Sequence, residues 1–181
     1  MRVVVFPFLI VLLLSAMDAT AADRVECRVK AKRQGLFKGS VGAQSEFIPI
    51  SGVSLQITSP RDAATGLPSG KRQYKPVVLT KEVDGSSPQF FASASTNEVI
   101  DSVTCNFVRL NGNGTETVHM VVTLTNALVV DISIAPESKK LLTEATGIPS
   151  EMEQVSLTFQ KIEIEDLDTK TFFADDWNLI S

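Results

Sequence analysis

The side chains that could do chemistry are few and scattered along this sequence. His119 is the sole histidine among 181 residues, so a metal site or a Ser–His–Asp triad would depend on it alone. No Gly-x-Ser-x-Gly pattern is present to offer a nucleophilic serine. Spacing does not exclude a pair of carboxylates for glycoside cleavage, but no pair stands out. The sequence therefore favours a protein that is not an enzyme.

Two short patterns resemble ligand loops and lack the residues that such loops need. Residues 66–72 are one residue short of a phosphate-binding loop, and Arg72 replaces the Ser or Thr that would hold magnesium. Residues 166–168 begin like a calcium loop, but Thr171 and Trp177 occupy the positions of its Gly and Glu. We predict no cofactor. Four acidic residues lie near the end of the last predicted strand, namely Glu163, Glu165, Asp166 and Asp168. We interpret them as a solvated acidic end, with loose cation binding as the alternative.

Cys27 and Cys105 are the only cysteines, and each occupies the apolar phase of an alternating segment. In an exported protein an even pair of cysteines can form a disulfide. Such a bond would close a loop of about 78 residues and stabilise the fold by roughly 4–5 kcal/mol. The alternative is two buried thiols that pack as small hydrophobic groups. Both interpretations stay open at the level of sequence.

Alternation of apolar and polar residues recurs along the chain and predicts strands. Residues 34–44, 59–70 and 136–152 are rich in Gly, Pro and short polar side chains, which predicts loops, the second of them a long exposed excursion. Pro76 indicates either an edge strand or the start of a paired region. The predicted strands cover residues 24–32, 53–57, 74–83, 99–110, 115–126, 128–135 and 153–165.

One helix is predicted between these strands. Ser87 can cap free backbone N–H groups, and Pro88 suits the first helical position. The helix should cover residues 89–96 and turn three side chains inward, namely Phe90, Phe91 and Ala94.

The last predicted strand changes phase, which predicts a bulge that bends the sheet or carries the strand around a barrel. Val155, Leu157 and Phe159 share one face, whereas Ile162 and Ile164 fall on the other. Six or seven strands without a βαβ rhythm predict a mainly β fold, an antiparallel barrel or sandwich with one short helix.

The amino terminus is typical of a secretory signal. Arg2 precedes an apolar run over residues 3–14, and residues 19–21 form a small-x-small cleavage site. We therefore expect a signal peptide over residues 1–21 and one domain over residues 22–181, with a core at about 25–165 and an acidic tail at 166–181. A retained anchor is an alternative, although the run is shorter than a spanning helix. A start at Met17 is another and would leave a cytoplasmic protein.

The charge balance argues against nucleic acid as a partner. The net charge is −4 and the chain has one Trp, whereas dedicated nucleic-acid binders carry a basic patch. The basic residues Lys30, Lys32 and Arg33 fit the solvated face and end of a strand. We also expect no stable membrane insertion once a signal is removed.

Two segments resemble the haemolysin-coregulated protein (Hcp) family, whose members form the tube of type VI secretion. Residues 70–91 resemble that family's basic, Pro-containing strand and the Ser-Ser-Pro helix start after it. Residues 153–163 resemble its closing strand, and the resemblance extends over about residues 25–165. The matching positions are Lys71, Pro76, Lys81, Glu82, Ser87, Pro88, Glu153, Gln154, Val155, Phe159, Gln160 and Lys161.

The resemblance implies an antiparallel β-barrel with one short helix packed beside it and a structural, self-assembling role. It implies that the chain's partner is itself, in a homo-oligomeric ring of hexameric type that can stack, with secretion cargo or a spike protein as further partners. Leu67 and Pro68 would then lie on a loop that contacts the next subunit.

The signal sequence departs from the family pattern, because tube subunits assemble in the cytoplasm and generally lack one. Three accounts follow: an Hcp-like protein exported by the general route, a tube subunit that starts at Met17, or a diverged single-ring binding protein. We favour the first, with a secreted or periplasmic location. The alternative function is a periplasmic or secreted binding module that uses the loop over residues 59–70.

We predict that the mature protein begins at Ala22 or Asp23, because signal peptidase cuts after a small-x-small sequence. Intact-mass measurement and amino-terminal sequencing of protein from the native host will check this. A mature form that retains Met1, or a cytoplasmic form that begins at Met17, would contradict it.

Overall fold

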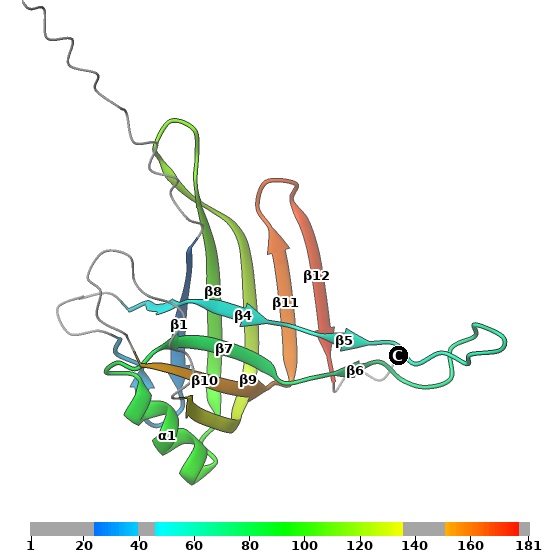
Figure 1. Cartoon of the computed structure of the whole chain (residues 1–181), viewed down its shortest axis with the longest axis horizontal. Coiled ribbons are helices and arrows are strands. Elements are labelled where there is room, and N and C mark those ends of the chain that lie inside the picture. The colour runs from blue at the N-terminus through cyan, green and yellow to red at the C-terminus, as the bar shows by residue number, and fades with distance from the viewer. Residues whose placement is uncertain (1–23, 40–45, 136–150, 178–181) are drawn as a thin grey trace, which may run out of the picture.

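The computed structural model describes residues 24–39, 46–135 and 151–177, which form twelve strands and one helix (Figure 1). The expected signal peptide and most of the loop predicted over residues 136–152 lie outside these residues. The strands are β1 (Arg24–Ala31), β2 (Gly35–Leu36), β3 (Ile48–Ile50), β4 (Gly52–Ser54), β5 (Ile57–Thr58), β6 (Gln73–Tyr74), β7 (Val77–Glu82), β8 (Ile100–Leu110), β9 (Glu116–Ala135), β10 (Met152–Thr158), β11 (Lys161–Asp166) and β12 (Thr171–Asp176); the helix is α1 (Ser87–Thr96).

The main sheet is antiparallel and returns on itself. Its strands follow the order β2-β1-β8-β9-β10-β7-β4. Residues 48–54 join its two sides, because β3 pairs with β1 and β4 pairs with β7. The backbone N–H of Ser51, between β3 and β4, donates to the carbonyl oxygen of Thr80 at 2.8 Å. The mainly β, barrel-like fold with one helix that the sequence predicts is therefore confirmed.

Alternating apolar side chains from these strands fill the interior. In β1 the side chains of Cys27, Val29 and Ala31 are buried while those between them are exposed. Because successive strand residues point to opposite faces, this pattern turns one face of β1 to the core. The helix adds Phe90, whose ring meets that of Phe37 edge to face at 5.0 Å.

The prediction of two strands over residues 115–126 and 128–135 is wrong, since β9 is continuous. Asn126 adopts φ 49°, in the left-handed region that Asn tolerates better than most residues. The strand thereby bends without ending. Residues 116–127 pair with β8 and residues 128–135 pair with β10. A sharp bend thus replaces the expected break.

The phase change in the last predicted strand separates β10 from β11. A register shift follows Ser156, and the backbone N–H of Gln160 donates to the carbonyl oxygen of Thr125 at 3.1 Å. Phe159 and Ile162 are both buried in the same core. The prediction that Ile162 faces away from Phe159 is therefore wrong, because the chain turns between the two strands and brings both phases inward.

The predicted acidic tail is also wrong in part, because its middle forms β12. This strand pairs with β11 along its whole length. The carboxylate of Asp166 accepts hydrogen bonds from the N–H groups of Asp168 and Thr169 and so builds the turn between the two strands. The acidic composition of residues 166–176 thus serves a hairpin turn and an edge strand.

The helix begins earlier than predicted and turns a different face inward. Ser86 occupies the N-cap position and Ser87 lies inside the first turn. Phe91, predicted to be buried, is 42% exposed. The buried face carries Ser87, Phe90 and Ser93, spaced three residues apart as one side of a helix requires.

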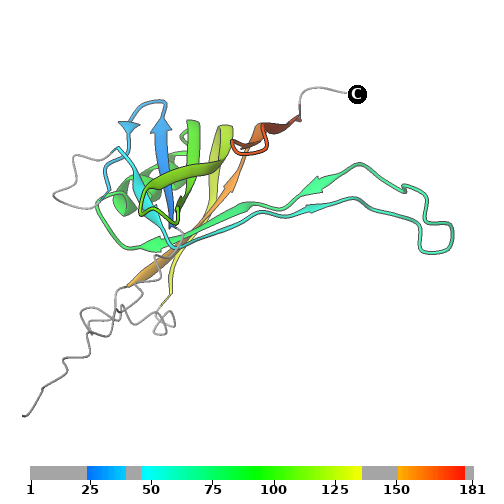
Figure 2. The same cartoon turned by 90° about the horizontal axis from the view of Figure 1, so that it is seen from above.

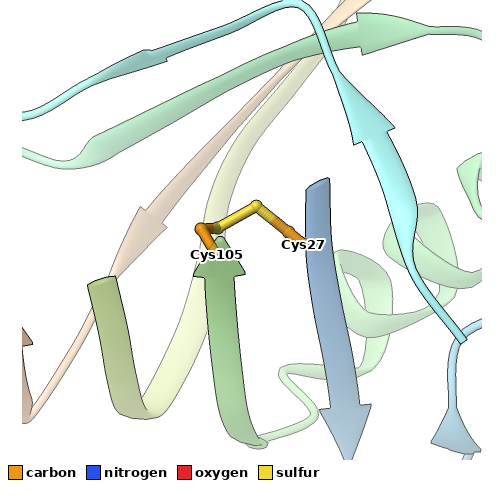
Figure 3. Close-up of a disulfide and its surroundings, with 2 residues drawn as sticks. All are labelled: Cys27 and Cys105. Carbon is orange, nitrogen blue, oxygen red and sulfur yellow. A yellow bond between two sulfur atoms is a disulfide. The ribbon is translucent and has the colours of Figure 1, made fainter. Parts of the chain in front are cut away.

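Cys27 and Cys105 form a disulfide between β1 and β8, as Figure 3 shows. The two cysteines are direct partners in the antiparallel ladder, and their Cα atoms lie 4.0 Å apart. Both side chains are buried. The bond therefore ties the strand that starts the described chain to the middle of the sheet.

We expect reduction to lower the free energy of unfolding by roughly 4–5 kcal/mol, because it frees a long loop in the unfolded chain. Urea unfolding with and without reductant, alongside a Cys27→Ser/Cys105→Ser variant, will measure this. Denatured, non-reduced protein should take up no alkylating agent. Quantitative labelling of two thiols in that state would contradict the bond.

Candidate assembly surface

A long arm projects from the barrel and is the most prominent feature of the surface (Figures 1 and 2). We define the arm as residues 55–75. Strands β5 and β6 pair with each other at its base in a separate two-stranded sheet. Farther out, a bridge joins Arg61 to Pro68. The arm is thus a hydrogen-bonded ribbon along much of its length, where the sequence predicted a loop.

The tip of the arm is organised by Asp62. Its Oδ1 atom accepts hydrogen bonds from the N–H and hydroxyl of Thr65, both at 2.8 Å, and from the N–H of Ala64 at 3.1 Å. The hydrogen bond from the Thr65 side chain is the main cause that lowers the pKa of Asp62. Gly66 then closes the turn at φ 71°, where a residue with a side chain would be strained.

The arm exposes apolar side chains where it has no neighbour. Leu67 is 64% exposed and Ile57 is 51% exposed. Pro68 is exposed as well, so both predicted ring-contact residues lie on the projecting tip. These apolar side chains are exposed at the tip and at the base of an element that projects from the barrel. The arm is also basic, since it carries four positive residues against Asp62, namely Arg61, Lys71, Arg72 and Lys75.

Pro76 lies between β6 and β7, where the arm leaves the barrel. β7 pairs with β10 on one side and β4 on the other, so it is not an edge strand. Of the two predicted positions, Pro76 takes the start of the paired region. A residue without an N–H group fits a place where the ladder begins.

A buried ion pair lies at the other end of β7. Lys81 and Glu153 are both 0% exposed, and Lys81 Nζ donates to Glu153 Oε1 at 2.8 Å. The same ammonium donates to Asp84 Oδ1 at 2.8 Å and to the carbonyl oxygen of Glu82 at 2.6 Å. Ser87, in the first turn of α1, donates its hydroxyl to Glu153 Oε1 at 2.8 Å. We call these four side chains the β7–α1 ion cluster: Lys81, Asp84, Ser87 and Glu153.

The cluster brings together the two segments that carry the family resemblance. Lys81 and Ser87 come from the first segment and Glu153 from the second, yet their polar atoms meet in one buried place. The sequence analysis did not predict this burial. The signal was present, because Lys81 shares its strand phase with Val77 and Leu79.

The other predicted positions are spread over the surface and core. Glu82, Pro88 and Gln154 are exposed, whereas Val155 and Phe159 belong to the core. Gln160 accepts a hydrogen bond from the Asn126 amide at 2.8 Å, and Lys161 pairs with Glu163 at 2.7 Å. These contacts stabilise the fold and do not build a catalytic site.

Three of the four acidic residues named near β11 make protein contacts, namely Glu163, Asp166 and Asp168. Glu163 binds Lys161, and Asp168 binds Arg109 at 2.7 Å. Within residues 24–39, 46–135 and 151–177, no three His, Cys, Asp or Glu side chains form a group that could hold a metal ion. His119 is half-buried, with its ring 6.5 Å from that of Phe107.

The family comparison decides what kind of protein displays this arm. The family described as "Type VI secretion system effector, Hcp" matches residues 31–165. The chain belongs to the Hcp family. It is 28% identical over 130 residues to the major exported protein of Pseudomonas aeruginosa strain PAO1. The aligned residues cover 72% of this chain and 74% of that relative.

Solved Hcp structures share the fold over nearly their whole length. A structure of an Hcp protein aligns with a TM-score of 0.77 at 22% identity, over 88% of this chain and 100% of that one. Hcp1 from E. coli EAEC 042 aligns with a TM-score of 0.73 at 25% identity, over 86% of this chain and 99% of that one. Hcp3 from Pseudomonas aeruginosa aligns with a TM-score of 0.69 at 22% identity, over 87% of this chain and 100% of that one.

The helix that the structure describes in this Hcp protein has 10 residues, and no helix within the described ranges is long and apolar enough to cross a membrane.

We predict that Lys81→Met lowers the free energy of unfolding by about 3–5 kcal/mol, because it leaves Glu153 buried without its cation. The double variant Lys81→Met/Glu153→Leu should recover most of this loss, since it removes both charges. Urea unfolding will measure both, with Glu82→Gln as the exposed control next in sequence. A single Lys81→Met variant as stable as the wild type would contradict the prediction.

Proposed function

We propose that this protein is the structural subunit of an Hcp ring and that it contacts the next copy through its arm. Membership of the Hcp family supports a type VI secretion tube subunit with no enzymatic activity. The observation that carries the role of the arm is the 64% exposure of Leu67 at the tip of a ribbon that projects away from its own barrel.

A ring requires two different surfaces on each subunit, because its contacts are heterologous and must close by rotation. The arm supplies one such surface. The edge strand β12 supplies another, since it pairs only with β11 and displays Phe172 and Phe173 at 63% and 47% exposure. An edge of this kind accepts another chain unless something covers it.

Proteins of this family form hexameric rings, and we propose the same closed state here, with stacking of rings as its extension. The first partner is therefore a second copy of this chain. Secretion cargo and a spike protein are further partners of the assembled ring. The exposed apolar side chains of the arm and of the β12 edge suit contacts with protein.

Export fits this role, as the Hcp relative from Pseudomonas aeruginosa is an exported protein. We propose that residues 1–21 direct this chain to the general export route and that the ring forms outside the cytoplasm. A disulfide between Cys27 and Cys105 suits that location, because oxidising compartments preserve such bonds.

We predict that Leu67→Asp abolishes rings and leaves a folded monomer, because a charge at an apolar contact opposes burial there. Light scattering and electron micrographs of the mature protein will measure assembly, and circular dichroism will confirm folding. Leu67→Met is the matched control and should keep rings, since it conserves size and polarity. Wild-type protein that remains monomeric at high concentration would overturn the ring and favour the secreted binding module.

A further inference from the structure

The arm needs an external support for its direction. Within the described residues its two strands form a sheet of their own, and an isolated two-stranded ribbon is at best marginally stable in water. Figure 2 shows it leading away from the barrel, with the barrel only at its base. Whatever holds the base therefore decides where the tip can reach.

An ion pair holds the base of the arm against β12, which lies near the carboxyl end of the described chain. Arg72, beside β6, donates from Nε and Nη2 to the two carboxylate oxygens of Asp175 in β12. Tyr74 in β6 donates its hydroxyl to Asp175 Oδ2 at 2.9 Å. The Asp175 side chain is 12% exposed, so a nearly buried carboxylate accepts three hydrogen bonds from the arm. A forked guanidinium contact of this kind fixes orientation as well as distance.

Two aromatic rings also pack against Tyr74. Its ring meets Phe159 at 5.3 Å and Trp177 at 5.8 Å, both edge to face. Trp177 follows β12 and is itself anchored, because its backbone N–H donates to the carbonyl oxygen of Gln160 at 3.0 Å. Tyr74 is thus held between the junction of β10 and β11 and the end of β12.

We infer that the hairpin of β11 and β12 is the clamp that sets the direction of the arm, and that Asp175 is the positioning residue for assembly. The inference rests on the proposed function only where it concerns rings. Residues 166–177 then have a role beyond forming a turn and an edge strand beside β11. They couple the carboxyl-terminal part of the described chain to the arm, because Asp175 binds Arg72, which lies 103 positions earlier in the sequence.

The electrostatics of the clamp keep it closed at neutral pH. The hydrogen bond from Arg72 is the main cause that holds the pKa of Asp175 below its usual value. Burial, helped by the nearby Asp175, raises the pKa of Tyr74 to about 12. A depressed carboxyl pKa means that the stabilisation is present above the unfolded value and is lost only as pH falls through the folded one.

The direct test is the distance between the arm and the barrel in the mature chain. Spin labels at Ala63→Cys on the arm and Lys30→Cys on β1 will report it, because both sites are exposed and Cys27 and Cys105 are bonded to each other. We expect a narrow distance distribution in the otherwise wild-type protein. Asp175→Asn and Arg72→Gln should each broaden it, with the far-ultraviolet circular dichroism unchanged.

The exchange Arg72→Asp/Asp175→Arg should narrow the distribution again, because it restores an opposite pair at the same place. Asp168→Asn is the matched control, since it removes an ion pair of the same hairpin that does not touch the arm. A narrow distribution in Asp175→Asn would overturn the clamp. A broad distance distribution in the exchange variant would also overturn the clamp, because an opposite pair restored at the same place would then fail to restore the direction of the arm.

Assembly provides the second measurement. A variant with a broadened distance distribution should form rings about fivefold more weakly in dissociation constant per contact. This corresponds to the upper range for a surface ion pair, as fits a pair whose cation, Arg72, is 42% exposed. Rings as stable in Asp175→Asn as in the wild type, despite a broadened distance, would overturn Asp175 as a positioning residue for assembly. If rings survive Leu67→Asp while Asp175→Asn still broadens the distance, the proposed arm contact fails and the clamp stands.

Discussion

Lys81 in β7 and Glu153 in β10 form a fully buried ion pair between two neighbouring strands of the sheet. Lys81 has a second carboxylate partner in Asp84, whereas the cation that Glu153 contacts is Lys81. Removing Lys81 would therefore leave Glu153 uncompensated away from water, which costs several kcal/mol. The pair therefore fixes how β7 lies on β10. Through Ser87 it also fixes where α1 begins, and so it joins the helix to the barrel.

The barrel then leaves only certain elements free. Residues 48–54 bridge the two sides of the sheet by pairing with β1 at one end and β7 at the other, and the disulfide ties β1 to β8. The chain leaves the sheet after β4, forms the arm and returns to it at β7. The arm and the edge strand β12 are two places where the described residues expose apolar side chains outside the core.

Several charged residues in the described part of the chain hold its shape. Lys81, Asp84 and Glu153 stabilise the interior, Asp62 and Asp166 build turns, and Asp175 holds the base of the arm. Each carboxylate accepts hydrogen bonds that fix a shape. A self-assembling subunit needs shape and exposed apolar area more than reactive groups, and the distribution of its polar contacts agrees with that need.

Local patterns in the sequence predicted most strands, the helix near Pro88, the apolar placement of both cysteines and the Hcp resemblance, because alternation and helix-start signals act over a few residues. Long-range packing brought Lys81 and Glu153 together in the interior, bent β9 at Asn126 without ending it, and made a strand of Thr171–Asp176. It also decided that Phe91 faces solvent. These outcomes depend on partners that lie far apart in the chain, and local periodicity carries no information about which distant strand will supply the pairing edge or the opposite charge.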